Sequence, residues 1–464
     1  MEINIRKSAG LLLAFIFLAA CMIATIPVPA SAEETENTWV PKAPMHVARS
    51  GLGVAVVCGK IYAIGGSTFC GMWPTESGGI VGVNEEYNPT MDIWTFKKTM
   101  PTPRTNFAIA TYQNKIYCIG GCTDTSISGD VITNVTEVYD PQTDTWETKS
   151  PMPTAQESLQ ANVVGGIIYL IGGYPNGTLN LAYDPATDSW STNANMPIAA
   201  GGITSCVTNN KIYLIGALSK NQNSVLNQIY DPETNQWHFG AASPSSVRYG
   251  AAGATTGINA PKRIYVLGKT LDLWEGEPPN FNRVYDLETN SWTFGSDILT
   301  YREGFGVAVL SDTLYVIGGF TLTYPNMQSR STGGYVTKYA TNEQYIPFGY
   351  GLVPRVVSPE ANKTYVGSEI QLMFTLGKTA SWLGYSLDAQ DNVTMSGNTT
   401  ITGLADGLHN LTVYAKDEFG NTGNSETIFF TVAEPFPALP FAVCVTSTAA
   451  VGIGTLIYLK KRRR

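Results

Sequence analysis

Arginine recurs at matching places along the sequence, in a pattern that could bind anions. Three arginines and one glutamine lie twelve residues before an Ile-Tyr or Leu-Tyr pair, and a further arginine fits the series if the stretch 255–262 contains about four extra residues. The set is Arg49, Arg104, Gln156, Arg248 and Arg302. Because a guanidinium group binds a carboxylate through two parallel hydrogen bonds, such side chains on one face would suit an acidic ligand. The alternative is a structural role, in which each arginine pairs with a carboxylate or carbonyl of the protein itself.

Two tryptophans extend this predicted ligand-binding set. Trp73 and Trp274 lie in stretches rich in Gly, Pro and polar residues, at positions that do not recur elsewhere in the sequence. Burial in a repeated core therefore does not explain them. Sugars and peptides stack on aromatic rings, and rings beside guanidinium groups are typical of sites for acidic glycans or acidic peptides.

The predicted strands that position these residues belong to a sequence repeat. A buried-strand phrase ending in glycine occurs six times, with its first glycine at 65, 120, 172, 216, 268 and 318. A second phrase follows five of the copies, in which a Tyr precedes a Trp by seven residues, as in "EVYDPQTDTW" at 137–146. Its Asp, Pro and Thr residues favour a tight turn, so the phrase predicts a hairpin. The buried-strand phrase and the apolar stretch before it predict a second hairpin. Each period of about 50 residues thus supplies the four strands of a propeller blade.

The recurrence of Gly-Gly, Tyr-Asp-Pro and Trp in this order resembles the kelch repeat. The resemblance implies an all-β fold, a six-bladed kelch β-propeller, which we assign to residues 37–349. Residues 37–46 resemble the end of a blade around Trp39, whereas the sixth copy has Tyr339 and no Trp seven residues later. We therefore predict that the strand at 37–46 completes the blade built from 303–340 and closes the ring.

Antiparallel pairing would bring the predicted binding residues together. The start of a blade's first strand lies beside the end of its second, so the arginine positions share a face with the loops that follow each glycine pair. The longest loops on that face are 67–84, 270–282 and 321–334. In kelch modules that bind acidic peptides, arginines at similar places line the pocket. The resemblance carries this role to Arg49, Arg104 and Arg302.

Catalysis is the less favoured alternative. The kelch class includes copper-dependent galactose oxidases and sialic-acid mutarotases, so the fold admits a sugar-directed enzyme. A copper site of the oxidase kind needs two histidines near the channel, but His46, His238 and His409 lie in places that cannot converge, and we predict no metal and no other cofactor. Glu157 and Glu303 are the acid/base candidates, yet they fall in blades three and six, on opposite sides of the ring.

Residues 353–433 predict a second domain. Apolar and polar residues alternate there between Gly, Asn and Asp turns, which is typical of a small β-sandwich. The stretch 403–423 resembles the final hairpin region of immunoglobulin-like modules that are common on microbial cell surfaces. We therefore predict an immunoglobulin-like β-sandwich that serves as a spacer.

Both ends of the sequence predict membrane targeting. Residues 1–32 combine basic residues, an apolar run and Ala-Ser-Ala, which is typical of a signal peptide; "LAAC" resembles a lipobox and leaves a lipid-modified Cys21 as the alternative. Residues 438–459 are 22 uncharged residues, long enough for a transmembrane helix, and the basic residues 460–464 predict a cytoplasmic tail. These features predict a single-pass cell-membrane protein with its N-terminal region outside.

The cysteines and sequons are compatible with an oxidising, glycosylated exterior. Five cysteines lie outside the two terminal segments, an odd number that forbids complete pairing. Cys70 and Cys122 follow the glycine pairs of adjacent blades and are the disulfide candidates. The glycosylation candidates are Asn134, Asn176, Asn362, Asn392, Asn398 and Asn410.

The composition narrows the class of partner. The formal net charge of −8 is spread along the chain without a basic patch, so a nucleic-acid partner has no support. The sequence therefore predicts a cell-surface binding or adhesion protein, not an enzyme, that captures an acidic glycan or protein ligand at one mouth of the propeller. The alternatives are a sugar-directed, mutarotase-like enzyme and a structural envelope component.

Overall fold

The chain folds into two compact all-β units. The computed structural model describes residues 35–69, 71–73, 79–126, 129–200, 202–216, 225–244, 247–269, 280–323 and 334–434. Every regular element in these ranges is a β-strand, and the division between the units falls between Tyr350 and Gly351.

The predicted single-pass membrane localisation is overturned. In the ranges given above, no helix is long and apolar enough to cross a bilayer, because all regular structure there is strand. The predicted signal peptide, 1–32, the predicted transmembrane helix, 438–459, and the basic tail, 460–464, lie outside the described residues.

Six four-stranded antiparallel sheets, the blades, form the first unit. Blade one contains β2 (Gly53–Val57), β3 (Lys60–Ile64), β5 (Asn84–Asn88) and β6 (Ile93–Lys97). Blade two contains β7 (Ala108–Tyr112), β8 (Lys115–Ile119), β11 (Thr136–Asp140) and β12 (Thr145–Lys149). Blade three contains β13 (Gln160–Val164), β14 (Ile167–Ile171), β15 (Asn180–Asp184) and β16 (Ser189–Thr192).

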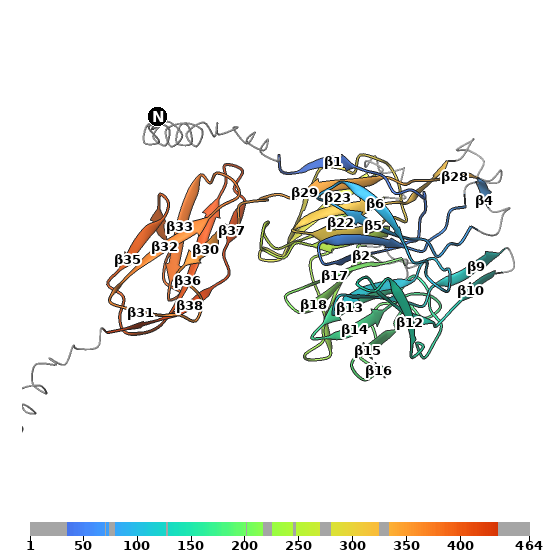
Figure 1. Ribbon diagram of the computed structural model, residues 1–464, viewed down its shortest axis with the longest axis horizontal. Helices are drawn as coiled ribbons and strands as arrows, with labels where there is room; N and C mark the ends of the chain where they lie inside the picture. Colours follow the sequence, from blue (N-terminus) through green and yellow to red (C-terminus); the bar gives the residue numbers. More distant parts are fainter. Residues whose placement is uncertain are drawn as a thin grey trace, which may run out of the picture. The chain divides into compact units, whose positions relative to one another are not determined.

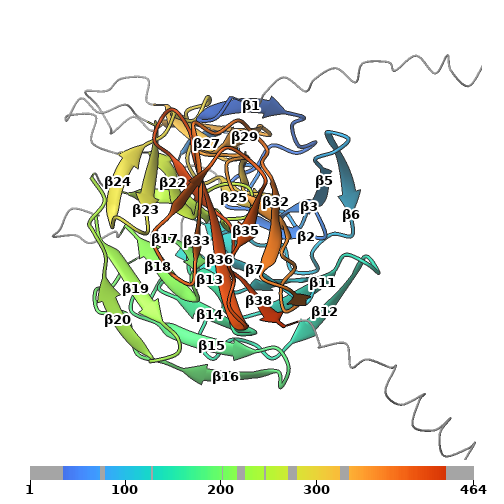
Figure 2. The same cartoon turned by 90° about the vertical axis from the view of Figure 1, so that its left-hand side faces the viewer.

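The remaining blades follow the same order. Blade four contains β17 (Thr204–Thr208), β18 (Lys211–Ile215), β19 (Asn227–Asp231) and β20 (Gln236–Phe239). Blade five contains β21 (Arg248–Ala254), β22 (Arg263–Lys269), β23 (Asn280–Asp286) and β24 (Ser291–Phe294). Blade six contains β25 (Gly306–Leu310), β26 (Thr313–Ile317), β29 (Asn342–Ile346) and β1 (Thr38–Lys42). Figure 2 shows the blades arranged around a centre, with β6, β16, β20 and β24 at the periphery.

The N-terminal strand closes the ring, as predicted. β1 pairs with β29 in blade six, with Trp39 opposite Tyr345. The repeat tyrosine of this blade is therefore Tyr345, and the prediction of Tyr339 and of a blade that ends at 340 was wrong. The sixth Tyr-Trp pair is assembled from the two ends of the propeller, so its spacing cannot be found by reading along the chain.

At each junction, a blade hydrogen-bonds to both the backbone N–H and the backbone carbonyl of one residue of the preceding blade. At Lys98, the N–H donates to Asp144 Oδ1 (2.9 Å) and the carbonyl accepts from Trp146 Nε1 (2.8 Å). Tyr139 positions the carboxylate by donating its hydroxyl to the same Oδ1 (2.6 Å). This hydrogen bond is the main reason why the pKa of Asp144 lies below its usual value.

This arrangement, which we call the Tyr-Asp-Trp clamp, is present at all six blade junctions. The residues held in the other five are Ala43, Ser150, Ala194, Ala241 and Ser296. The acidic or amide residue has a positive φ in every clamp, which Asp and Asn tolerate better than most residues. At the closure, Asn37 and Trp39 hold Ser296.

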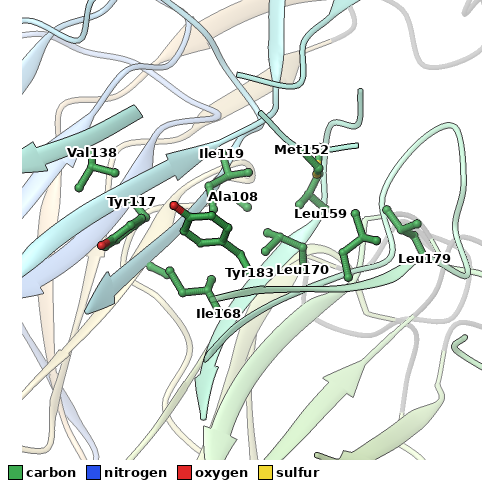
Figure 3. Close-up of a cluster of buried hydrophobic side chains, with 12 residues drawn as sticks. Ala108, Tyr117, Ile119, Val138, Met152, Leu159, Ile168, Leu170, Leu179 and Tyr183 are labelled. Carbon is green, nitrogen blue, oxygen red and sulfur yellow. The ribbon is translucent and has the colours of Figure 1, made fainter. Parts of the chain in front are cut away.

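Apolar side chains fill the space between neighbouring blades. The cluster in Figure 3 joins blades two and three and includes Tyr117, Ile119, Leu170 and Tyr183. The rings of Tyr117 and Tyr183 lie 6.1 Å apart between centroids. Each sheet is thus buried by its neighbours, which explains why a single repeat cannot fold alone.

We expect Trp39→Ala to weaken the ring closure. The change removes the hydrogen bond to the Ser296 carbonyl (2.8 Å) and the packing on Tyr345, so the free energy of unfolding should fall by about 3 kcal/mol. Urea denaturation measures this. The matched control is Phe239→Ala on the outer strand β20, where the ring is 57% exposed and the loss should stay within about 0.5 kcal/mol. Equal losses in both variants would contradict the role of the clamp in closure.

The second unit consists of two packed sheets. The first sheet contains β30 (Arg355–Ser358), β32 (Glu369–Thr375) and β35 (Thr399–Thr402). The second contains β31 (Thr364–Val366), β38 (Ile428–Ala433), β36 (Gly407–Lys416), β33 (Trp382–Leu387) and β34 (Val393–Met395), and β37 (Thr422–Asn424) pairs with β36. Buried and exposed residues alternate along β32, and its buried Leu372 shares a core with Val413 and Phe430 of the second sheet. The immunoglobulin-like assignment of this unit stays a prediction.

A buried histidine makes the sandwich unit sensitive to pH. The two ring nitrogens of His409 face acceptors, with Nδ1 2.8 Å from Asp388 Oδ2 and Nε2 2.7 Å from the Ala405 carbonyl. Burial alone would lower the pKa of His409, but these two bonds and the charge of Asp388 outweigh it and raise the pKa above its usual value. Both nitrogens can donate only when the ring is protonated.

We therefore predict that the contribution of His409 to the stability of this unit falls as the pH rises above about 6.5. A pKa that is raised on folding contributes stability that is fully present below the unfolded value, about 6.5, and is lost as the pH rises through the folded pKa. Hydrogen exchange of the β36 amides between pH 5 and 9 should show protection falling with pH in the wild type after correction for intrinsic rates. In His409→Gln the fall should be absent, and in the control His238→Gln it should persist. A wild-type protection that is flat across this range would contradict the prediction.

Candidate functional site

The predicted mouth of the propeller exists and carries additional strands. Four backbone bridges join the residue after each arginine position to the residue after a glycine pair, and they are Ser50–Ser67, Thr105–Cys122, Glu157–Tyr174 and Glu303–Phe320. This confirms the prediction that the arginine positions lie beside the loops. We call the surface formed by these bridges and the loops that follow them the loop face.

Loops from different blades pair with each other on the loop face. The loop of blade two forms a hairpin of β9 (Cys122–Ser126) and β10 (Gly129–Ile132). The loop of blade six forms β27 (Phe320–Thr323) and β28 (Gly334–Lys338), and β28 also pairs with β4 (Gly71–Trp73) from blade one. These strands project from the same side of the propeller (Figure 1). Their apolar side chains include Val131 (52% exposed) and Tyr335 (51%), and Tyr174 of blade three is 62% exposed.

The predicted anion-binding arginines are internal braces. The side chain of Arg104 is completely buried and donates to Glu137 Oε2 (2.5 Å), the Thr102 carbonyl (3.0 Å) and the Cys118 carbonyl (2.8 Å). Arg49 binds Glu85 in the same way, and Arg302 binds Glu343. Each pair ties the segment before a blade's first strand to its third strand.

These ion pairs neutralise the arginines that were predicted to make the mouth of the propeller positively charged. Burial alone would raise the pKa of Glu85, but the hydrogen bond and charge of Arg49, together with bonds from His46, lower it below the usual value. Glu85 is therefore ionised and balances Arg49. The geometry assigns the three arginines a bracing role, and their contact with a ligand remains only a sequence-based prediction.

The braces have a sequence signal that the pattern of arginines alone did not reveal. The partner lies two residues before the repeat tyrosine, and the residues in this place are Glu85, Glu137, Leu181, Gln228, Arg283 and Glu343. In blade three both residues of the brace differ. Gln156 replaces the arginine, and Leu181 replaces the glutamate. Gln156 is completely buried, and its Oε1 accepts from the Asn176 N–H (3.3 Å).

The other predicted site residues are only partly described. Arg248 begins β21 opposite Lys269, and Trp73 ends β4 opposite Gly334, but their side chains lie outside the described part of the structure. Trp274 lies outside the described residues altogether. The roles of these three residues in ligand binding stay predictions.

The predicted disulfide and glycosylation sites also stay predictions. Cys70 lies outside the described residues, and Cys122 is a free, buried thiol whose Sγ donates to the Asp124 carbonyl (2.9 Å). Burial raises the pKa of Cys122 to about 11. Four sequon asparagines are exposed, Asn176, Asn362, Asn392 and Asn398, and two are half-buried, Asn134 and Asn410.

The described side chains of the loop face carry more negative than positive charge. The carboxylates are Asp124, Asp130, Glu157 and Glu303, and the ammonium group is Lys338, apart from the buried ion pairs. The central channel differs from the loop face in its charge. Its cavity of about 360 Å³ is lined by the first strands of all six blades, and the lining residues are uncharged. Over the described ranges, no group of three or more His, Cys, Asp or Glu residues could hold a metal ion.

The comparisons with known proteins agree with this fold. The kelch motif matches residues 48–101 and 103–153, and a second form of the motif matches 201–244. These segments correspond to blades one, two and four. Kelch motifs are therefore identified in three of the six blades, which supports the predicted kelch β-propeller.

Curated relatives match about 30% of the chain. Kelch-like protein 35 of Mus musculus is 29% identical over 137 residues, which is 30% of this chain and 22% of the relative. Beta-scruin of Limulus polyphemus is 32% identical over 142 residues, 30% of this chain and 15% of the relative. The chain thus spans about a fifth of the length of these curated relatives. A solved structure titled "Structure of YjhT" matches with a TM-score of 0.49 and 16% identity, over 64% of this chain and 95% of the other.

We predict that the brace of blade two can be replaced by that of blade three. Arg104→Gln alone leaves Glu137 buried without its partner and should lower the free energy of unfolding by about 3–5 kcal/mol. Adding Glu137→Leu recreates the Gln156–Leu181 combination and should recover most of that loss, because no charge is left buried. Urea denaturation of the two single variants and the double variant measures the coupling. Additive losses would contradict the bracing role.

Proposed function

We propose that the chain is a protein-binding propeller whose docking surface is the loop face. The observation that supports this most directly is the exposure of Val131, Tyr174 and Tyr335 on loops from three different blades. Tyrosine is enriched at protein interfaces because it offers a large apolar ring together with a polar hydroxyl group. The paired strands β4 and β28 would hold this surface in a defined shape before the partner binds, which reduces the entropy lost on association.

The charge of the loop face favours a partner with basic groups. Arg49, Arg104 and Arg302, which suggested an acidic ligand, are paired inside the blades, whereas Asp124, Asp130 and Glu157 have no such arginine partner among the described residues. Opposite potentials across an interface speed association and exclude wrong partners. An acidic glycan or acidic peptide therefore has no support from this surface.

The alternative of a sugar-directed enzyme has weaker support. Its acid/base candidates, Glu157 and Glu303, lie before the first strands of blades three and six, which face each other across a six-bladed ring. Two carboxylates that act together on a glycosidic bond are about 5–9.5 Å apart. Opposite blades do not favour such a spacing.

Site-specific photo-crosslinking tests the docking surface. We expect a photoreactive amino acid at position 335, in the protein produced in its native cells, to give a discrete protein adduct, and one at position 239 on the outer strand β20 to give none. Tyr174→Ser should reduce the adduct from position 335 about tenfold, since truncation of an interface tyrosine costs about 1–2 kcal/mol. Phe239→Ser should leave it unchanged. Adducts from position 239 alone, or an adduct from 335 that is indifferent to Tyr174→Ser, would refute the proposal.

A further inference from the structure

Glu157 is a buried carboxylate without a counter-charge. Its side chain is only 7% exposed, and its one hydrogen bond is a long one, from Asn106 Nδ2 to Oε2 (3.5 Å). Within the described part of the chain, Oε1 accepts no hydrogen bond. The buried glutamates of blades one, two and six each bind an arginine, whereas Glu157 binds neither an arginine nor a lysine in the described part of the chain.

The surroundings of Glu157 add negative charge and an exposed ring. Burial raises the pKa of Glu157, and the charge of Asp130 on β10 raises it further. Tyr174 is the backbone bridge partner of Glu157, and its ring is exposed to solvent. Two carboxylates beside an aromatic ring are a suitable environment for an organic cation, because the ring face attracts positive charge.

Blade six has the equivalent glutamate and aromatic residue, and there a lysine lies against the ring. Glu303 and Phe320 occupy the positions that Glu157 and Tyr174 occupy in blade three, and they form the equivalent backbone bridge. There, Lys338 of β28 lies with its Nζ 4.7 Å from the centre of the Phe320 ring and donates to Ser50 Oγ (2.5 Å). In blade six, a lysine side chain thus lies against the aromatic residue at this position of the repeat.

We infer that Glu157 and Asp130, beside Tyr174, form a subsite for one lysine or arginine side chain of a protein partner. The subsite rests on the proposed function, since it lies on the loop face between blades two and three. The partner's cation would donate to the unpaired Oε1 of Glu157 and lie against the Tyr174 ring, as Lys338 lies against Phe320. A metal ion is a poorer fit, because two carboxylates provide fewer ligands than metal sites in proteins use.

Titration with a lysine peptide tests the subsite directly. The probe is Gly-Gly-Lys-Gly-Gly with both ends blocked, and the control peptide has norleucine in place of lysine. We expect the lysine peptide to bind wild-type protein about tenfold more tightly than the norleucine peptide, and Glu157→Gln to abolish this preference. Glu233→Gln, which removes one negative charge from the exposed turn between β19 and β20, away from the loop face, should retain it.

A second measurement does not depend on any variant. The ¹³C carboxyl resonance of Glu157 in the wild-type protein should titrate at lower pH when the lysine peptide is present, because a neighbouring cation favours the ionised form. Equal binding of the two peptides, equal effects of Glu157→Gln and Glu233→Gln, or an unchanged Glu157 titration would each overturn the subsite.

The two proposals fail separately. An adduct from position 335 that depends on Tyr174, together with no preference for lysine, would refute the subsite and leave the docking surface intact. A preference for lysine that requires Glu157, without any adduct from position 335, would support the subsite and refute the docking surface.

Discussion

The structure depends on the clamp that joins each blade to the one before it. A single peptide unit at each junction, such as that around Lys98, has its N–H bound by Asp or Asn and its carbonyl bound by Trp. The carbonyl also accepts from an asparagine of its own blade, Asn84 Nδ2 at Lys98 (3.3 Å), so the clamp adds a bond from the next blade to a peptide unit that its own blade already holds. Because the same contacts recur at all six junctions, the last of them, made by Asn37 and Trp39, forces the N-terminal strand into blade six.

The rigid ring explains why arginine is used for bracing. The segment before the first strand is joined to the loop after the second strand by a single backbone bridge, and Arg49, Arg104 and Arg302 tie it further to backbone carbonyls and to a glutamate on the third strand. A fully buried guanidinium group requires a carboxylate, and a residue that is balanced in this way contributes little charge to the surface. The potential of the loop face is therefore set by the residues that lie outside the braces.

The positions where the repeats differ are the ones that remain available for function. Blade three lacks the Arg-Glu brace and instead has Gln156 and Leu181, and the next residue along the chain, Glu157, is the carboxylate without a cation. In blade six, Lys338 of the inserted strand β28 lies against Phe320, the equivalent of Tyr174. Six copies of one scaffold thus provide an internal comparison, in which the cation bound to the aromatic residue of one blade suggests what the equivalent residue of another blade could bind.

The sequence by itself determined the blade number, the order of strands and the closing strand, because the recurrent Gly-Gly and Tyr-Asp-Pro-Trp phrases specify local hairpins whose geometry is set within a few residues. It also placed the arginines beside the loops, since antiparallel pairing follows from the same local pattern. Only the tertiary structure decided that Glu85, Glu137 and Glu343 neutralise those arginines and that Tyr345, not Tyr339, faces Trp39. These contacts join residues 33 to more than 300 positions apart, and a partner across such a separation is selected by packing and burial rather than by spacing along the chain.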